Sequence, residues 1–371
     1  MLSGFCTILA VGAFAAGTPF YGINEDLVWQ PETDLPKVIT ALTDCCAESI
    51  RLPIRWTVIE PEKDRWEFSR VDSVIQAVPP HVEILATLMS VPAWANGTTP
   101  GDVEGYFDAY PPKELEDWQR FVEKTVTRYK HRITHWEVWN EQNGIDFYRP
   151  MPDPAGYTRL LRSAYEAAKR ADPRCRVVLG GLQMNGIIPN PWSPVKIPDF
   201  LEDLYKAGAR PHFDICNVHP YVLPNEGAGY MMRLVRDTLA LMDRYGDSDK
   251  PLWITEVGCG INERDTAEDQ ARLLEDTFRL ARQEPRIQRV FWFLLRDTKE
   301  SILGPEDTMG LVTHDFQPKP AFHAFVKAVK AVEPVDAAAP PPLTRVSAPM
   351  VPTSWLDRTV RRIPSPASTA I

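Results

Sequence analysis

The chain has 371 residues, of which 44% are hydrophobic and 25% are charged, a composition typical of a globular protein with one large core. Its formal net charge of −9 provides no basic surface for a nucleic acid, and it disfavours acidic polymers as partners. The six cysteines form no CxxC pair and no spacing typical of zinc ligands, so we expect buried free thiols.

The first residues of the chain form an apolar segment. Residues 4–16 read GFCTILAVGAFAA and end in small residues, as the hydrophobic part of a secretory signal does. No Lys or Arg precedes the segment, and it is too short for an ordinary membrane span. We therefore treat residues 1–17 as an apolar leader, expect no membrane span, and leave both export and a cytoplasmic location open.

Short β-rich runs then alternate with amphipathic stretches of helical length, the pattern of repeated βα units. The pattern predicts strands at residues 20–24, 49–55, 82–89, 133–139, 176–181, 213–218, 251–255 and 289–295. It predicts helices at residues 34–47, 69–77, 113–130, 154–171, 199–207, 229–245, 266–283 and 320–332. A Ser69–Asp72 capping pattern and Asp153 before Pro154 support two of the helix starts.

These repeated units predict an α/β fold, a (β/α)8 TIM barrel in one domain of residues 18–333. The alternative is a doubly wound open sheet, but the chain contains no GxGxxG or P-loop sequence that would favour it. From Glu333 the composition changes to Pro, Ala and Ser, which predicts a disordered tail over residues 334–371. Docking of the tail through Trp355 and its arginines is the alternative for that segment.

Two segments, HWEVWNEQN at residues 135–143 and LWITEVG at residues 252–258, each place a glutamate after a short apolar run. Glu141 follows the predicted fourth strand and Glu256 ends the seventh, and reactive residues of such barrels lie at these strand ends. A pair of carboxylates is the minimum needed to hydrolyse a glycosidic bond. Since strict alternation would aim Asn140 away from Glu141, we expect the strand to have ended or to bulge there.

Other chemistries have no support in the sequence. The chain contains no HExxH motif, EF-hand loop, phosphate-binding loop, Ser-His-Asp elbow or nicotinamide fingerprint, and its seven histidines are scattered. We therefore expect neither a metal nor a cofactor.

These segments, together with RLPIRWTVIEPEKDRWEFSRVD (residues 51–72) and LMSVPAWAN (residues 88–96), resemble the clan A glycoside hydrolases. The likeness is greatest to glycoside hydrolase family 39 and related bacterial barrels, and it extends from YGIN at Tyr21 to FWF at Phe291. It implies a retaining β-glycoside hydrolase that acts on an oligo- or polysaccharide by double displacement through a covalent glycosyl-enzyme. The implied partner is a carbohydrate substrate.

The resemblance implies roles for residues around the two glutamates. Glu141 would be the acid/base, Glu256 the nucleophile, and Asn140 a ligand of the sugar 2-hydroxyl. Arg51 would lie beside the nucleophile and keep it ionised, with Arg55 as the alternative.

Further residues would bind substrate or orient the cleft. The resemblance implies that His219 orients groups in the cleft, with a purely structural core histidine as the alternative, and that Tyr221 donates a hydrogen bond near Glu256. Trp292 would form the floor of the sugar subsite, with a core residue as the alternative. Weaker subsite candidates are Trp94, Trp29, Trp56, Tyr148 and Trp192. Glu137 is interpreted as a buried, paired carboxylate, and Asp297 as either an ion-pair or a rim residue.

Two departures from the family pattern affect these expectations. Gln142 stands where many relatives have proline, so we expect a looser turn after Glu141. No β-sandwich sequence follows the barrel, unlike many family 39 xylosidases, which makes an endo-acting polysaccharide hydrolase at least as plausible. The alternatives are a catalytically inactive carbohydrate-binding barrel, and inversion or transglycosylation in place of retention with hydrolysis. The sequence assigns neither the sugar nor the oligomeric state.

Overall fold

A computed structural model describes residues 19–28, 34–99, 107–183, 196–298 and 307–331. The predicted leader and tail, and the subsite candidates Trp29 and Trp192, lie outside the described residues. Among the helices of the described segments, none combines the length and the apolar character that crossing a bilayer requires.

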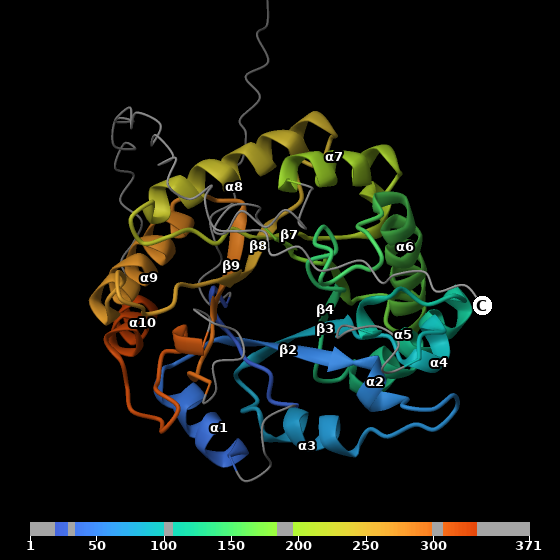
Figure 1. Cartoon of the computed structure of the whole chain (residues 1–371), viewed down its shortest axis with the longest axis horizontal. Coiled ribbons are helices and arrows are strands. Elements are labelled where there is room, and N and C mark those ends of the chain that lie inside the picture. Colours follow the sequence, from blue (N-terminus) through green and yellow to red (C-terminus); the bar gives the residue numbers. More distant parts are fainter. Residues whose placement is uncertain (1–18, 29–33, 100–106, 184–195, 299–306, 332–371) are drawn as a thin grey trace, which may run out of the picture. The chain divides into compact units, whose positions relative to one another are not determined.

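The described strands form a barrel, as predicted from the sequence (Figure 1). They pair in parallel in the order β5-β4-β3-β2-β1-β9-β8-β7-β6. Their bounds are β1 Tyr21–Asn24, β2 Ser49–Arg55, β3 Glu83–Met89, β4 His135–Val138, β5 Arg176–Leu179, β6 Leu182–Gln183, β7 Cys216–His219, β8 Leu252–Val257 and β9 Ile287–Phe293. The predicted fifth strand ends early, at Leu179, and the short β6 follows just beyond the predicted range, so the predicted sixth to eighth strands are β7 to β9. A parallel bridge between Val178 and Ile215 joins β5 to the start of β7 and closes the barrel.

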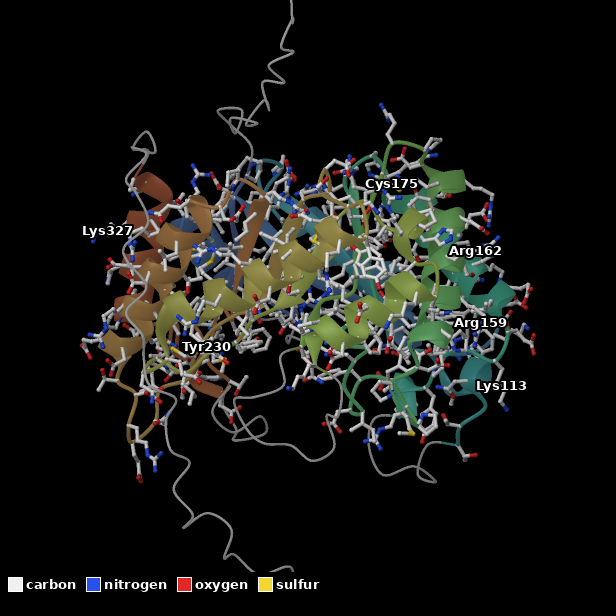
Figure 2. All side chains as sticks on the ribbon, turned by 90° about the horizontal axis from the view of Figure 1, so that it is seen from above. Lys113, Arg159, Arg162, Cys175, Tyr230 and Lys327 are labelled. Atoms are coloured by element: carbon white, nitrogen blue, oxygen red, sulfur yellow. The ribbon has the colours of Figure 1, made fainter. Side chains whose placement is uncertain are left out.

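Helices surround the sheet in the alternation that the sequence predicts (Figure 1). They are α1 Leu35–Asp44, α2 Trp56–Ile59, α3 Ser69–Ala77, α4 Ala93–Asn96, α5 Leu115–Tyr129, α6 Pro154–Ala171, α7 Ile197–Lys206, α8 Gly227–Arg244, α9 Ala267–Arg282 and α10 Pro320–Lys330, with 3-10 turns η1 Phe107–Ala109 and η2 Arg210–His212. Each long helix buries an apolar face against the sheet and turns charged side chains outward, as Arg159, Arg162 and Lys327 show in Figure 2.

The helix-start predictions have mixed outcomes. Asp153 is the N-cap residue of α6, although its side chain makes no capping hydrogen bond. The Ser69 prediction is wrong: Ser69 is the first residue inside α3, and Asp72 instead accepts hydrogen bonds from Arg128 and Tyr129 of α5. A reciprocal capping box occurs at Thr266, ahead of α9.

The barrel interior is layered, and the layering places the polar residues toward the C-terminal ends of the strands. One buried apolar cluster inside the barrel consists of Leu85, Val178, Ile215, Trp253 and Phe291. On β1, Gly22 makes room for this layer, since a Cβ there would collide with the Phe291 ring. Two residues after Leu85, Ile215 and Trp253 come the buried polar side chains of Thr87, Asn217 and Thr255. Glu137 on β4, which pairs with Thr87 in the sheet, is a fourth. The floor beneath the barrel mouth is therefore polar.

The cysteines among the described residues are free thiols, as predicted. Four of them, Cys45, Cys175, Cys216 and Cys259, are buried. Cys259 lies three residues after Glu256 in the sequence, but burial raises the pKa of its thiol to about 12, so it stays protonated and unreactive at neutral pH.

Candidate active site

The backbone after β4 turns Asn140 and Glu141 toward the barrel mouth. β4 ends at Val138, and Trp139 and Glu141 have positive φ angles of 74° and 49°. The Glu141 backbone N–H donates to the Gly181 carbonyl at 2.9 Å, which fixes the turn against the segment between β5 and β6. The strand has thus ended before Asn140, as alternation required. Such φ values are uncommon for residues with a Cβ and concentrate at functional sites.

Gln142 holds this turn against the segment after β5. Its side chain is fully buried, and its Nε2 donates to the Gly180 carbonyl at 2.8 Å. Whether the turn is looser than one with proline stays a prediction. An amide side chain replaces the conformational restraint of proline with a hydrogen bond across to the next strand.

Arg51 on β2 connects three groups of the site. Its Nη1 donates to Oε1 of Glu256 at 2.6 Å, and its Nη2 donates to Oδ1 of Asn140 at 2.7 Å. Its Nε donates to Oε2 of Glu137 at 2.6 Å. The guanidinium is buried, so these contacts are weakly screened by solvent.

Arg55, the alternative to Arg51, lies four residues further along β2 and serves a different group. Its Nη2 contacts Oδ2 of Asp26 at 2.5 Å, and its side chain is 18% exposed. Arg51 is therefore the arginine that the structure brings to the candidate nucleophile.

Glu137 is fully buried and paired, as interpreted from the sequence. Beside Arg51, its carboxylate accepts hydrogen bonds from the Thr87 hydroxyl at 2.9 Å, from Nδ2 of Asn217 at 2.9 Å and from the Gly181 backbone N–H at 3.0 Å. This many donors around one carboxylate indicates a structural anion that anchors Arg51 and is inaccessible to a substrate.

His219, at the end of β7, lies between the two candidate catalytic glutamates. Its Nδ1 is 2.9 Å from Oε1 of Glu141 and 3.8 Å from Oε2 of Glu256, and its Nε2 is 2.9 Å from the Thr255 hydroxyl. The ring lies against Gly181, where a Cβ would collide with the imidazole. Its polar partners are thus site residues, which favours an orienting role over that of a core histidine.

The charges of the site follow from burial and from Arg51. Burial raises the pKa of Glu256, and the Arg51 guanidinium and the Tyr221 hydroxyl oppose that rise. Burial disfavours the Arg51 cation, but Glu137 and Glu256 outweigh that effect and raise the pKa of Arg51. Burial lowers the pKa of His219 despite the Glu141 carboxylate beside it. His219 is therefore neutral, and Glu256 depends on Arg51 and Tyr221 to stay ionised.

Tyr221 and the end of β9 form the aromatic side of the site. The Tyr221 hydroxyl donates to Oε2 of Glu256 at 2.9 Å, as the resemblance implied. The Phe293 ring lies edge-on to the Tyr221 ring, with centroids 6.3 Å apart, and Phe293 is partly exposed.

The expectation for Trp292 needs correction. Trp292 is fully buried, and its indole N–H donates to the Met309 carbonyl at 3.0 Å. A sugar cannot reach its face, because β9 directs its odd-numbered residues into the barrel and Trp292 points outward. The aromatic residue that the structure presents beside the nucleophile is Phe293, one residue later.

The other aromatic candidates contribute packing. The Trp94 indole N–H donates to the Glu60 carbonyl at 2.9 Å, and its ring packs edge-on against the buried Trp56. Tyr148 is buried too. Within the described residues, Trp94 hydrogen-bonds to Glu60 and packs against Trp56 and Lys63, and neither catalytic candidate is among these partners.

Asp297, the last residue with an open interpretation, forms a local ion pair. Its Oδ1 lies 3.0 Å from Nζ of Lys319, and it also accepts the Gly310 backbone N–H at 2.8 Å. This pairing supports the structural interpretation over a rim contact to sugar.

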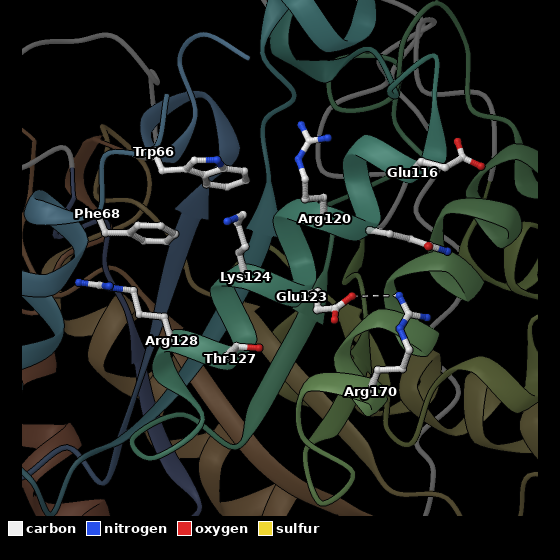
Figure 3. A pocket seen from close by; sticks show the side chains of 10 residues that line it. Trp66, Phe68, Glu116, Arg120, Glu123, Lys124, Thr127, Arg128 and Arg170 are labelled. Atoms are coloured by element: carbon white, nitrogen blue, oxygen red, sulfur yellow. Dashed lines mark hydrogen bonds and ion pairs between the residues drawn. The ribbon is translucent and has the colours of Figure 1, made fainter. Parts of the chain in front are cut away.

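A hollow of 220 Å³ opens at the C-terminal ends of β2, β3 and β4, where Trp139, two residues before Glu141, forms part of its wall. Arg55 and Met89 continue the inward-facing positions of β2 and β3 and also line it, with Asp108 and Asp146 at its side. A larger hollow of 780 Å³ lies elsewhere, on the outer surface of α5. Figure 3 shows it lined by Trp66, Phe68, Arg120, Lys124 and Arg128, residues remote from the catalytic candidates in the fold.

Glu141, His219 and Glu256 offer ligand atoms that all lie within 4.8 Å of one another, a spacing that a metal ion could bridge. The donor set does not favour one. The Arg51 cation already contacts Glu256 at 2.6 Å, and a second positive charge there would be repelled. The glutamate pair is therefore better suited to acid–base and nucleophilic chemistry than to metal binding.

Comparison with protein families and solved structures identifies the kind of barrel. A model of glycosyl hydrolase family 10 matches residues 52–194, and a model of the glycosyl hydrolase catalytic core matches residues 176–317. Each match covers less than half of the chain, but together they span both candidate glutamates. A search of the curated proteins found no match.

Several solved glycosidases share the fold. A family 39 glycoside hydrolase from Bacteroides cellulosilyticus WH2 is 20% identical with a TM-score of 0.64, and the match covers 84% of this chain and 64% of that one. A β-xylosidase from Caulobacter crescentus CB15 is 18% identical with a TM-score of 0.66, covering 84% and 68%. A GH5_18 protein from Streptomyces cattleya is 17% and 19% identical in its two structures, with TM-scores of 0.65 and 0.64, and each match covers 85% of this chain and 82% of that one. The chain thus spans about two thirds of the length of the first two. By its fold and by these two partial family matches, the chain is a (β/α)8 barrel similar to the glycoside hydrolases.

Proposed function

We propose that the chain is a retaining β-glycoside hydrolase in which Glu256 is the nucleophile and Glu141 the acid/base. The separation of the two carboxylates supports this most strongly, since a carboxylate oxygen of each lies within 4.8 Å of the other. Retaining pairs are about 5 to 5.5 Å apart, whereas inverting pairs leave about 6.5 to 9.5 Å for a water molecule. The short separation favours double displacement.

The contacts suit the two roles. Glu256 receives hydrogen bonds from Arg51 and Tyr221, which favour its carboxylate form before it attacks the anomeric carbon. The bond from Glu256 to the sugar forms as the glycosidic bond breaks, and Glu141 gives its proton to the leaving oxygen. Glu141 then removes a proton from water, and the resulting attack releases the sugar from Glu256.

Asn140 is oriented for substrate by Arg51. Because its Oδ1 accepts from Nη2 of Arg51 at 2.7 Å, the Nδ2 group is the end of the amide directed at a sugar. Its place beside Glu141 in the chain suits a hydrogen bond to the 2-hydroxyl. That contact strengthens as positive charge develops at the adjacent anomeric carbon.

The hollow at the C-terminal ends of β2, β3 and β4 supports an oligo- or polysaccharide substrate. Its 220 Å³ and its mixture of carboxylates with the partly exposed Phe147 ring suit a further sugar ring next to the cleaved one. The Phe147 ring would cover an apolar face, and Asp108 and Asp146 would accept hydrogen bonds from hydroxyls.

Product stereochemistry tests the proposed reaction. We expect proton NMR of a hydrolysed β-glycoside to show the β-anomer of the sugar first, with the α-anomer appearing only later by mutarotation. First appearance of the α-anomer would establish inversion and contradict the assignment of Glu256 as nucleophile. Sugar binding with no hydrolysis across a broad panel of β-linked substrates would favour a binding barrel instead.

Phe293 and Trp292 offer a matched pair for testing which aromatic residue meets the sugar. Phe293→Ala should lower kcat/KM about tenfold, through loss of stacking beside the reacting ring, with a small change in thermal stability. Trp292→Ala should lower the free energy of unfolding by about 3 to 5 kcal/mol, because it leaves a cavity behind β9. Chemical denaturation and steady-state kinetics on both variants measure these effects, and the reverse pattern would restore Trp292 as the sugar-facing residue.

A further inference from the structure

A chain of buried hydrogen bonds approaches His219 from the side opposite Glu141. The Asn217 Nδ2 donates to the Thr255 hydroxyl oxygen at 2.8 Å, and that oxygen lies 2.9 Å from Nε2 of His219. All three side chains are fully buried. None of them appears in the nucleophile or acid/base step, so their arrangement needs a reason beyond those roles.

The direction of each hydrogen bond in this chain can be worked out. Asn217 is anchored by its Oδ1, which accepts the Thr255 backbone N–H at 3.2 Å, so its Nδ2 must face the Thr255 hydroxyl and Glu137. An amide nitrogen only donates, so the Thr255 oxygen is an acceptor there. The single hydroxyl proton of Thr255 can therefore be donated either to Nε2 of His219 or to Oε1 of Glu137.

Glu137 is the poorer acceptor for that proton. Its Oε1 already receives three donors, from Gly181 at 3.0 Å, Asn217 at 2.9 Å and Arg51 at 3.1 Å. The Thr255 hydroxyl is 3.3 Å from this oxygen but 2.9 Å from Nε2 of His219. The hydroxyl therefore donates to Nε2, and a neutral imidazole that accepts at Nε2 carries its proton on Nδ1.

We propose that Thr255, held by Asn217, fixes His219 as the Nδ1–H tautomer and thereby places the catalytic proton of Glu141 on Oε2. This inference rests on the proposed role of Glu141 as acid/base. Nδ1–H donates to Oε1 of Glu141 across 2.9 Å, so Oε1 is an acceptor in both protonation states. The acid proton then occupies Oε2, the oxygen turned away from the imidazole, from which it can reach the leaving group.

The opposite tautomer would work against catalysis. An unprotonated Nδ1 would face Oε1 with a lone pair, so it would draw the Glu141 proton to Oε1 and repel the carboxylate after the proton has left. The charged groups around the imidazole agree with Nδ1–H. Two carboxylates, Glu141 and Glu256, face Nδ1, while on the Thr255 side the charge of Glu137 is paired with Arg51. Thr255 and Asn217 are positioning residues, since neither reaches the substrate.

Leaving-group dependence tests this role. Thr255→Val removes the hydroxyl at nearly constant volume, and we expect kcat/KM for an alkyl β-glycoside, which needs protonation of its leaving oxygen, to fall by about 10- to 100-fold. For the dinitrophenyl β-glycoside of the same sugar, which leaves without a proton, kcat/KM should stay within about threefold. Thr255→Ser keeps the hydroxyl and should restore the parent values, while Thr255→Ala should repeat the split. An equal loss on both substrates would show a merely structural role and overturn the proposal.

The tautomer itself can be observed without turnover. In protein labelled with ¹⁵N-histidine, the His219 signals should show the proton on Nδ1 in the parent and in Thr255→Ser, and a mixture of tautomers in Thr255→Val. A parent His219 protonated on Nε2 would overturn the proposal even if Glu141 is the acid. Failure of the proposed function looks different, because Glu141→Ala would then hydrolyse the alkyl glycoside as the parent does.

Discussion

Glu256→Ala is expected to lower kcat on a β-glycoside by about 10⁴-fold or more, because no other group can form the glycosyl-enzyme. Azide then distinguishes the two glutamates. In Glu256→Ala, azide entering the space of the lost carboxylate attacks the anomeric carbon of an activated aryl glycoside and gives the α-glycosyl azide. In Glu141→Ala, the glycosyl-enzyme still forms from the activated substrate, and azide attacking it gives the β-glycosyl azide.

Glu62→Ala is a matched control for these variants. The Glu62 side chain is 71% exposed and pairs only with Arg65 among its recorded ion pairs in the described residues, so its loss should leave kcat, KM and the anomeric outcome unchanged. Product analysis by NMR measures the anomer in each case. If the two azide products appeared in the opposite variants, the roles of Glu141 and Glu256 would be exchanged, and undiminished hydrolysis by Glu256→Ala would exclude it as the nucleophile.

The barrel could be predicted from the sequence because each of its units repeats a strong local pattern. Strand β2 was predicted at its observed bounds from its β-rich run, and α6 was predicted at its bounds from apolar periodicity and from Pro154 at its start. The early end of β5 and the separate β6 could not be predicted. Between them the Gly181 carbonyl accepts from the Glu141 backbone N–H, a contact between distant segments that no local pattern encodes.

Some residues of the candidate site could also be predicted from the sequence, and others could not. The period-two spacing of His219 and Tyr221 predicted that they share a face, and each contacts one of the two candidate catalytic glutamates. The orientation of β9 could not be read, because strands buried on both faces are apolar throughout and VFWFLL shows no alternation. Trp292 was assigned to the sugar by its match to the family pattern, and no alternation in the sequence pointed to Phe293 instead. Thr255 was missed because it acts on Glu141 only through His219. A single threonine before a glutamate in the sequence does not indicate such an indirect contact.

Arg51→Gln should move the acidic limb of the pH profile of kcat/KM to higher pH by about one unit or more. Glu256 must be ionised to attack, so activity is lost as pH falls through its pKa. Burial raises that pKa and the Arg51 cation opposes the rise, so removing the cation lets the pKa rise further. The nucleophile is then protonated over part of the range in which the parent is active.

The free energy of unfolding of Arg51→Gln should fall as well, because Glu137 loses its ion pair in the barrel interior. Removing one partner of a buried pair costs about 3 to 5 kcal/mol. Arg51→Lys keeps the charge and provides a variant that folds if the glutamine does not. One ammonium cannot contact Glu137, Glu256 and Asn140 together. We therefore expect the acidic limb of Arg51→Lys to move to higher pH, but by less than in Arg51→Gln.

Arg55→Gln is the control that separates the charge of Arg51 from a general loss of positive charge at the barrel mouth. Arg55 is on the same strand and also faces the mouth, but its recorded ion pair is with Asp26, so the acidic limb should stay where it is in the parent. The pH dependence of kcat/KM on one aryl β-glycoside measures all three variants. An unmoved acidic limb in both Arg51 variants, or an equal shift in Arg55→Gln, would show that Arg51 does not hold the nucleophile ionised.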